Sequence, residues 1–107
     1  MPKLVLKFKD SVLQEIPLNK SCVTIGRTGE NDVVINNLGV SRQHARIIQD
    51  NDEYTLEDLG SRNGTILNNE EIKHSKLKDK DEIVIGKHTV VFSVEDAADS
   101  EDRKSVV

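Results

Sequence analysis

Aromatic side chains and cysteine are scarce in this sequence of 107 residues. It has no tryptophan, and its aromatic residues are Phe8, Tyr54 and Phe92. A folded core therefore has to be filled mainly by valine, isoleucine and leucine, which pack well on a pleated sheet. The one cysteine, Cys22, has no partner in the chain for a disulfide. That favours a reducing compartment, and we expect the cytoplasm.

Long apolar runs are also missing. No segment approaches the roughly 18 consecutive apolar residues that indicate a membrane-spanning helix. Met1-Pro2-Lys3 leads directly into a strand-like segment rather than into a secretion signal. We therefore expect no membrane partner.

The formal net charge of −4 is unevenly distributed. Residues 95–107 carry −3, so the remaining 94 residues carry −1. A near-neutral body lacks the basic face that general nucleic-acid binding requires, although it leaves room for a small basic site. We predict one domain over residues 1–95, followed by an acidic flexible tail or linker over residues 96–107.

Alternation with a period of two dominates the domain. Leu4, Leu6 and Phe8 alternate with lysines at most of the intervening positions, and short runs recur at 23–25, 33–35, 45–47, 54–56, 83–85 and 90–94. Turn residues bound these runs, and no window predicts an amphipathic helix. The pattern is typical of an all-antiparallel β-sandwich or barrel. Pro17 predicts an edge strand or a bulge in its own short run.

Three loops contain polar residues that a simple strand connection does not need. They lie within residues 25–33, 37–45 and 58–65, and they join the third strand to the fourth, the fourth to the fifth and the sixth to the seventh. In an up-and-down sheet the first two loops would lie at opposite ends. A very short strand at 33–35 would instead let both loops reach one rim.

Four motifs in or after these loops carry a resemblance to a known family. They are Gly26-Arg27, Ser41-Arg-Gln-His44, Gly60-Ser-Arg-Asn-Gly-Thr65 and Asn68. Each motif alone is weak, but in this order, in an all-β chain of this length, they resemble the forkhead-associated (FHA) domain from about Lys3 to Val94. The resemblance implies an antiparallel β-sandwich of two sheets with about eleven short strands. It also implies that loops at one end bind phosphothreonine peptides.

The resemblance indicates which residues contact such a peptide: Arg27, Ser41, Arg42, Arg62 and Asn63. A phosphothreonine presents nearly two negative charges and three acceptor oxygens, so it needs fixed cations and donors. Asn63 is expected to pair with the main chain of the ligand. Arg62 departs from the small hydroxyl residue that is frequent at this position in the family. It either adds a second guanidinium to the phosphate or contacts the peptide downstream.

A second group of residues is expected to hold the loops in place: Gly26, His44, Gly60, Gly64, Thr65 and Asn68. His74 and His88 are expected to be ordinary surface residues. The three histidines and one cysteine show no metal-ligand spacing, and no third group is apparent to orient His44 toward Ser41 for catalysis. We therefore expect no enzyme activity, no metal and no cofactor.

The interpretation that follows is a phosphothreonine-dependent interaction module in kinase-linked signalling. Its partner would be a protein phosphorylated by an upstream Ser/Thr kinase and bound in trans. The alternative is a scaffold or oligomerisation module that uses the same fold without phosphate.

Overall fold

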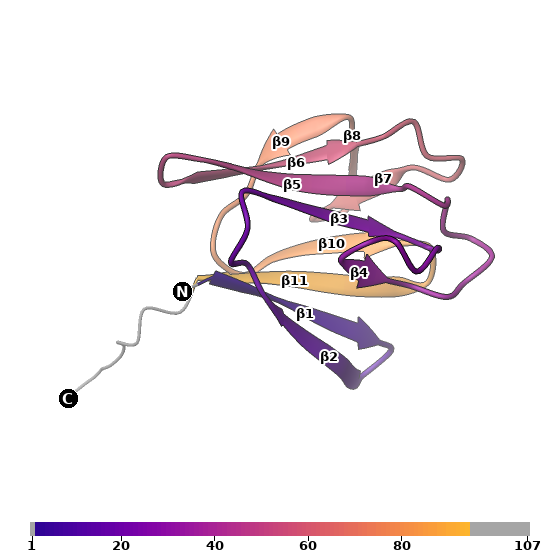
Figure 1. Cartoon of the computed structure of the whole chain (residues 1–107). Helices are drawn as coiled ribbons and strands as arrows, with labels where there is room; N and C mark the ends of the chain where they lie inside the picture. Colours follow the sequence, from indigo (N-terminus) through magenta and orange to yellow (C-terminus); the bar gives the residue numbers. More distant parts are fainter. Residues whose placement is uncertain (1, 95–107) are drawn as a thin grey trace.

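Two β-sheets pack face to face in the computed structural model, which describes residues 2–94 (Figure 1). These residues form eleven strands: β1 (Pro2–Phe8), β2 (Ser11–Pro17), β3 (Cys22–Gly26), β4 (Val33–Val34), β5 (Ala45–Asp50), β6 (Glu53–Asp58), β7 (Thr65–Leu67), β8 (Glu70–Ile72), β9 (His74–Lys76), β10 (Asp81–Ile85) and β11 (His88–Val94). Within residues 2–94 there is no helix that is long and apolar enough to cross a membrane. The predicted acidic tail lies outside the described residues.

One sheet has the strand order β2-β1-β11-β10-β7-β8, and the other has the order β4-β3-β5-β6-β9. The first and last strands are neighbours, with Leu4 opposite Phe92. Neighbouring strands are antiparallel except β3 and β4, which run parallel. The predicted two-sheet sandwich of about eleven strands is confirmed, and the expectation that every pair is antiparallel is wrong for this one.

The core between the sheets is aliphatic, as the scarcity of aromatic residues predicts. Leucine, isoleucine and valine side chains from both sheets are buried there together with Phe92. Tyr54 packs against Phe92 with ring centroids 5.2 Å apart. Each fully buried aliphatic side chain stabilises the fold by about 1.5–3 kcal/mol, so the core can be built without tryptophan.

β2 is an edge strand, which confirms the prediction made from Pro17. It pairs only with β1, and the register shifts between Leu6 and Lys7 of β1. A proline at the end of an edge strand is tolerated because no neighbouring strand needs its missing N–H.

The short β4 brings three loops to one end of the sandwich (Figure 1, right). Its two residues lie beside the last residues of β3, with Ile25 opposite Val33. β5 starts and β6 stops at this same end, where Ala45 lies opposite Asp58. The β3–β4, β4–β5 and β6–β7 loops therefore share one rim, as a very short strand at 33–35 predicts.

Candidate functional site

Main-chain hydrogen bonds tie the β4–β5 loop to the end of β3. The Arg27 N–H donates to the Ser41 carbonyl oxygen at 3.0 Å, and the His44 N–H donates to the Ile25 carbonyl oxygen at 2.9 Å. These bonds extend the pairing of β3 with β5 into the loop. Arg27 and Ser41 are thereby fixed side by side.

Gly26 lies at the tightest point of this junction. A Cβ atom at Gly26 would lie 2.1 Å from the carbonyl oxygen of Arg42 and 2.6 Å from Nδ2 of Asn31. The buried Asn31 fills the space beside the glycine and donates through Nδ2 to the carbonyl oxygens of Arg42 (2.8 Å) and Thr28 (2.9 Å). Gly26 is thus required by close backbone approach, and Asn31 joins the β3–β4 and β4–β5 loops.

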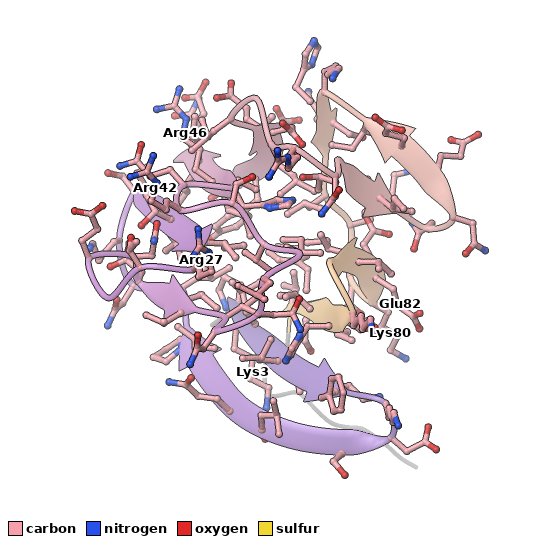
Figure 2. All side chains as sticks on the ribbon, turned by 90° about the vertical axis from the view of Figure 1, so that its right-hand side faces the viewer. Lys3, Arg27, Arg42, Arg46, Lys80 and Glu82 are labelled. Carbon is pink, nitrogen blue, oxygen red and sulfur yellow. The ribbon has the colours of Figure 1, made fainter. Side chains whose placement is uncertain are left out.

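A pocket of about 250 Å³ lies between the three loops. It is lined by Arg27, Leu38, Gly39, Val40, Ser41, Arg42, Arg62 and Asn63. All five residues expected to contact a phosphopeptide are in this lining, and no carboxylate is. Figure 2 looks onto this end of the molecule, where Arg27 lies nearer the centre of the face and Arg42 nearer its edge.

Arg27 is oriented toward the pocket by one of its own donors. Its Nε donates to the carbonyl oxygen of Val40 at 3.0 Å. The two terminal nitrogens of the guanidinium have no hydrogen-bond partner within residues 2–94. Since a guanidinium stays charged at any ordinary pH, Arg27 presents a fixed, doubly donating cation to the pocket.

Ser41 connects two of the loops. Its Oγ accepts a hydrogen bond from the Arg62 main-chain N–H at 3.0 Å. The hydroxyl hydrogen has no acceptor within the described part of the chain, so Ser41 can still donate to an anion. The same bond fixes the backbone of Arg62 at the pocket rim, while the side chain of Arg62 is exposed.

His44 joins the β4–β5 and β6–β7 loops by hydrogen bonds beneath the pocket. It is fully buried, its Nδ1 accepts from the Ser41 main-chain N–H at 3.1 Å, and its Nε2 lies 2.9 Å from the carbonyl oxygen of Gly64. Because Nδ1 is the acceptor, Nε2 must carry the hydrogen and donate to Gly64. Neither ring nitrogen is left to act as a base on the Ser41 hydroxyl.

Asp58 organises the β6–β7 loop. Its carboxylate accepts from the Ser61 N–H (2.7 Å), the Ser61 hydroxyl (2.5 Å) and the Thr65 hydroxyl (2.8 Å), and Ser61 Oγ in turn accepts from the Gly64 N–H (3.0 Å). Partial burial by itself raises the pKa of Asp58, but the hydrogen bonds from Ser61 and Thr65 outweigh it and hold that pKa below its ordinary value. The loop is therefore built around an ionised carboxylate.

Asn63 lies on the boundary between the pocket and a second cavity. Its Nδ2 donates to the Gly39 carbonyl oxygen at 2.9 Å, and its Oδ1 has no partner within residues 2–94. The second cavity, of about 670 Å³, is lined by Asn36, Asn37, Leu38, Gly39, Asn63, Gly86 and Lys87. The two cavities share Leu38, Gly39 and Asn63 in their linings.

The profile of the FHA domain family matches residues 23–86, a segment that contains all three loops. The chain belongs to the FHA domain family. Its fold and the arrangement of its loops can be compared with those of other members.

Relatives and solved structures agree with this membership. The glycogen accumulation regulator GarA of Mycobacterium tuberculosis is 34% identical over 89 residues, which cover 83% of this chain and 55% of GarA. The structure of M. tuberculosis EmbR with a low-affinity phosphopeptide has 33% identity and a TM-score of 0.78, over 86% of this chain and 24% of EmbR. An FHA domain studied for phosphothreonine-dependent interactions has 29% identity and a TM-score of 0.78, over 87% of this chain and 97% of its own. The chain spans about half the length of the first curated relatives it matches.

Other expected scaffold residues of this FHA domain lie around the β6–β7 loop and the β7–β8 turn. Gly60 and Gly64 have φ values of +76° and +86°, a region that favours glycine. Thr65 is buried and donates to Asp58. Asn68 instead bonds to the start of β10, where its Oδ1 accepts from the Glu82 N–H at 3.0 Å. Asn68 therefore braces the β7–β8 turn and makes no hydrogen bond to the three loops.

The remaining histidines take no part in the pocket. His74 is exposed, as expected, but His88 is half-buried and its ring lies against Phe8 with ring centroids 4.9 Å apart and planes tilted by 41°, so its assignment as an ordinary surface residue is wrong. Burial lowers the pKa of His88. Residues 2–94 contain no group of three or more histidine, cysteine or acidic side chains that could hold a metal ion.

Asn31 and Asp58 hold the loops by hydrogen bonds, but no role was predicted for either residue from the sequence. Asp58 precedes Ser61 by three positions, and aspartate commonly accepts from nearby main-chain N–H groups in turns, so a local signal for it exists. Asn31 bonds locally to Thr28, but its bond to Arg42, 11 positions away, which joins the two loops, has no local signal.

Proposed function

We propose that this FHA domain is a phosphothreonine-dependent interaction module that binds phosphorylated proteins through the loops at one end of its sandwich. The observation that carries the proposal is the pocket of about 250 Å³, which gathers three arginines and a serine hydroxyl and has no carboxylate in its lining. We further propose a Ser/Thr kinase upstream, a partner bound in trans and a cytoplasmic location. The half-buried thiol of Cys22 is free, which is consistent with a reducing compartment.

The pocket supplies what a phosphate dianion requires. Arg27 offers two terminal nitrogens in a fixed orientation, and Ser41 offers a hydroxyl hydrogen beside it. Charge-assisted hydrogen bonds of this kind are about twice as strong as those between neutral groups. Because Arg27 and Ser41 are already joined through their main chains, little order has to be gained on binding.

Threonine is favoured over serine by one methyl group. Leu38 and Val40 are the apolar side chains of the pocket lining. Burial of one methyl is worth about 0.8 kcal/mol, which corresponds to roughly a fourfold preference.

Asn63 is suited to hold the ligand backbone. Its free Oδ1 can accept from a peptide N–H, and its Nδ2 can exchange the Gly39 carbonyl for a ligand carbonyl. A ligand held in this way is extended across the boundary between the two cavities.

Binding rather than catalysis is supported by the state of His44. Both ring nitrogens are engaged in loop contacts, so the pair of Ser41 and His44 has no general base. We propose that the domain has no enzyme activity of its own.

Fluorescence anisotropy with a phosphothreonine peptide library tests the proposal. We expect the wild type to bind phosphorylated but not dephosphorylated peptides, and Arg27→Ala to lose at least about tenfold in affinity because it removes a charged hydrogen-bond donor. Arg46→Ala is the matched control, since Arg46 is held by Glu57 at 2.8 Å and does not line the pocket.

Affinity should also fall below about pH 6, where the phosphate dianion gains a proton. Equal binding of Arg27→Ala and wild type would refute the proposal. Equal capture of phosphorylated and dephosphorylated ligands would point to the phosphate-independent scaffold.

A further inference from the structure

The pocket contains more positive charge than one phosphothreonine can neutralise. Arg27, Arg42 and Arg62 each bring one permanent positive charge to the same lining. A phosphothreonine carries about −1.5 to −2 near neutral pH. One guanidinium is therefore left without a counter-charge when a single phosphate is bound.

Among residues 2–94, no carboxylate forms an ion pair with any of these three arginines. Within residues 2–94 the ion pairs are Lys3–Glu15, Lys20–Asp32, Arg46–Glu57 and Lys76–Glu53. Arg46, which follows the same loop, is held by a carboxylate, whereas Arg42 and Arg62 are exposed and have no carboxylate partner in the described part of the chain. Their charge is available to a ligand.

Arg62 is the better placed of the two for a second ligand group. Arg42 also lines a neighbouring cavity of about 390 Å³ together with Glu30, whose carboxylate repels an anion there. Arg62 has no acidic neighbour in the pocket lining and directly precedes Asn63, which borders both cavities. Its main chain is fixed by Ser41, and Arg62 lines the first pocket beside Asn63, where the two cavities meet.

We infer, on the basis of the proposed function, that the ligand carries a second anionic group close to the phosphothreonine and that Arg62 binds it. The second group is a carboxylate or a second phosphate, because both match the forked guanidinium. Phosphothreonine segments rich in acidic residues, or phosphorylated twice, are thus the ligand class of this domain.

Three peptide sets test this inference. The first has a phosphothreonine with neutral flanks, the second adds one glutamate stepped through the neighbouring positions, and the third adds a second phosphothreonine at the same positions. We expect at least one position at which glutamate raises the affinity of the wild type about fivefold at low salt, as a well-placed exposed ion pair can. A second phosphate there should raise it by more, and salt should reduce both gains.

Arg62→Gln should abolish the ratio between acidic and neutral peptides, and Arg46→Gln should preserve it. The inference is overturned if no position gives a gain in the wild type, or if the ratio persists in Arg62→Gln. Failure of the wild type to bind the neutral-flanked phosphothreonine peptide would instead overturn the proposed function itself. Thermal unfolding of both variants checks that they are folded.

Discussion

His44 determines how the binding residues are placed, although it lies beneath the pocket and outside its lining. One ring nitrogen supports the loop of Ser41, and the other supports the loop of Gly64, next to Asn63. A buried histidine that meets both hydrogen-bonding requirements is rigid, because an unmade bond there would cost about 1–3 kcal/mol. The positions of Ser41 and of Asn63 are thus coupled.

Asp58→Asn should lower the free energy of unfolding by about 1 kcal/mol near neutral pH, because an amide has one acceptor oxygen and cannot serve both the Ser61 N–H and the two hydroxyls, which reach different carboxylate oxygens. The folded pKa of Asp58 lies below its unfolded value. The stabilisation that the Asp58 carboxylate contributes to the folded state is therefore fully present above the unfolded pKa of about 3.9. It is lost as the pH falls through the folded pKa.

Urea unfolding of both proteins from about pH 7 to about pH 2.5 measures this difference. The pKa of Asp32 is lowered by hydrogen bonds from Lys20 and Thr24. Asp32 is present in both proteins, so the pH dependence that it adds to stability does not affect the difference between them. A difference that stays constant into acid would contradict the role of the Asp58 carboxylate.

The residues of the pocket were predicted more completely than their contacts. The resemblance of the motifs to the FHA family indicated Arg27, Ser41 and Asn63, and their order and spacing could be compared without coordinates. The hydrogen bond of Asn63 to Gly39, 24 positions away, depends on two loops meeting in space. No local pattern encodes such a contact, and the burial of His88 against Phe8 escaped prediction for the same reason.

At the scale of elements, the pairing of β4 with β3 decides where the binding loops lie. The Ile35 N–H donates to the Gly26 carbonyl oxygen at 2.9 Å, which continues this parallel pairing by one residue. An antiparallel β4 of ordinary length would carry the next loop to the far end of the sandwich. The pocket therefore depends on the parallel pairing of the short β4 with β3.

Gly26→Ala should destabilise the protein by about 2 kcal/mol or more, because its Cβ would overlap backbone and side-chain atoms that cannot move independently. It should also weaken phosphopeptide binding, since the overlap separates the first two loops. Gly29→Ala is the control: a Cβ there meets nothing within 4 Å, and both stability and binding should be nearly unchanged. Urea unfolding and peptide titration measure the two effects, and similar behaviour of the two variants would contradict this account.

Longer strands were predicted well and shorter ones poorly. Alternation is visible in β1, β10 and β11, which have five to seven residues each. β7, β8 and β9 have three residues each, too few for a period of two to stand out from chance. The direction of β4 depends on hydrogen bonds to a distant strand, so its short length was predictable but its parallel pairing was not.

At the scale of the molecule, the aromatic part of the core lies away from the binding loops. Phe92 packs with Tyr54 in the half of the core near the β5–β6 turn, opposite the three loops (Figure 1). In this order of strands β1 lies beside β11, so the first and last strands of the sandwich pair with each other. Such distant pairing is not visible in local sequence patterns.

Phe92→Leu should therefore lower the free energy of unfolding by about 1–2 kcal/mol and leave the Kd for a phosphothreonine peptide unchanged well below the melting temperature. Urea unfolding and anisotropy on the same preparation measure both quantities. A parallel loss of affinity would show that the core and the pocket are mechanically linked.

Ser61 also affects how long the side chain of Asn63 stays chemically intact. In an asparagine–glycine pair the glycine nitrogen can attack the asparagine side chain, release ammonia and leave aspartate or isoaspartate after hydrolysis. Here the attacking N–H of Gly64 is held by Ser61 Oγ at 3.0 Å, and the amide of Asn63 is held by Gly39 at 2.9 Å. Ser61→Ala should thus deamidate at Asn63 about fivefold faster, which peptide mass spectrometry after incubation in mildly alkaline buffer measures; equal rates would contradict this protection. Each deamidated molecule would place a carboxylate in the lining of the pocket, so the geometry of one turn sets the chemical lifetime of the site.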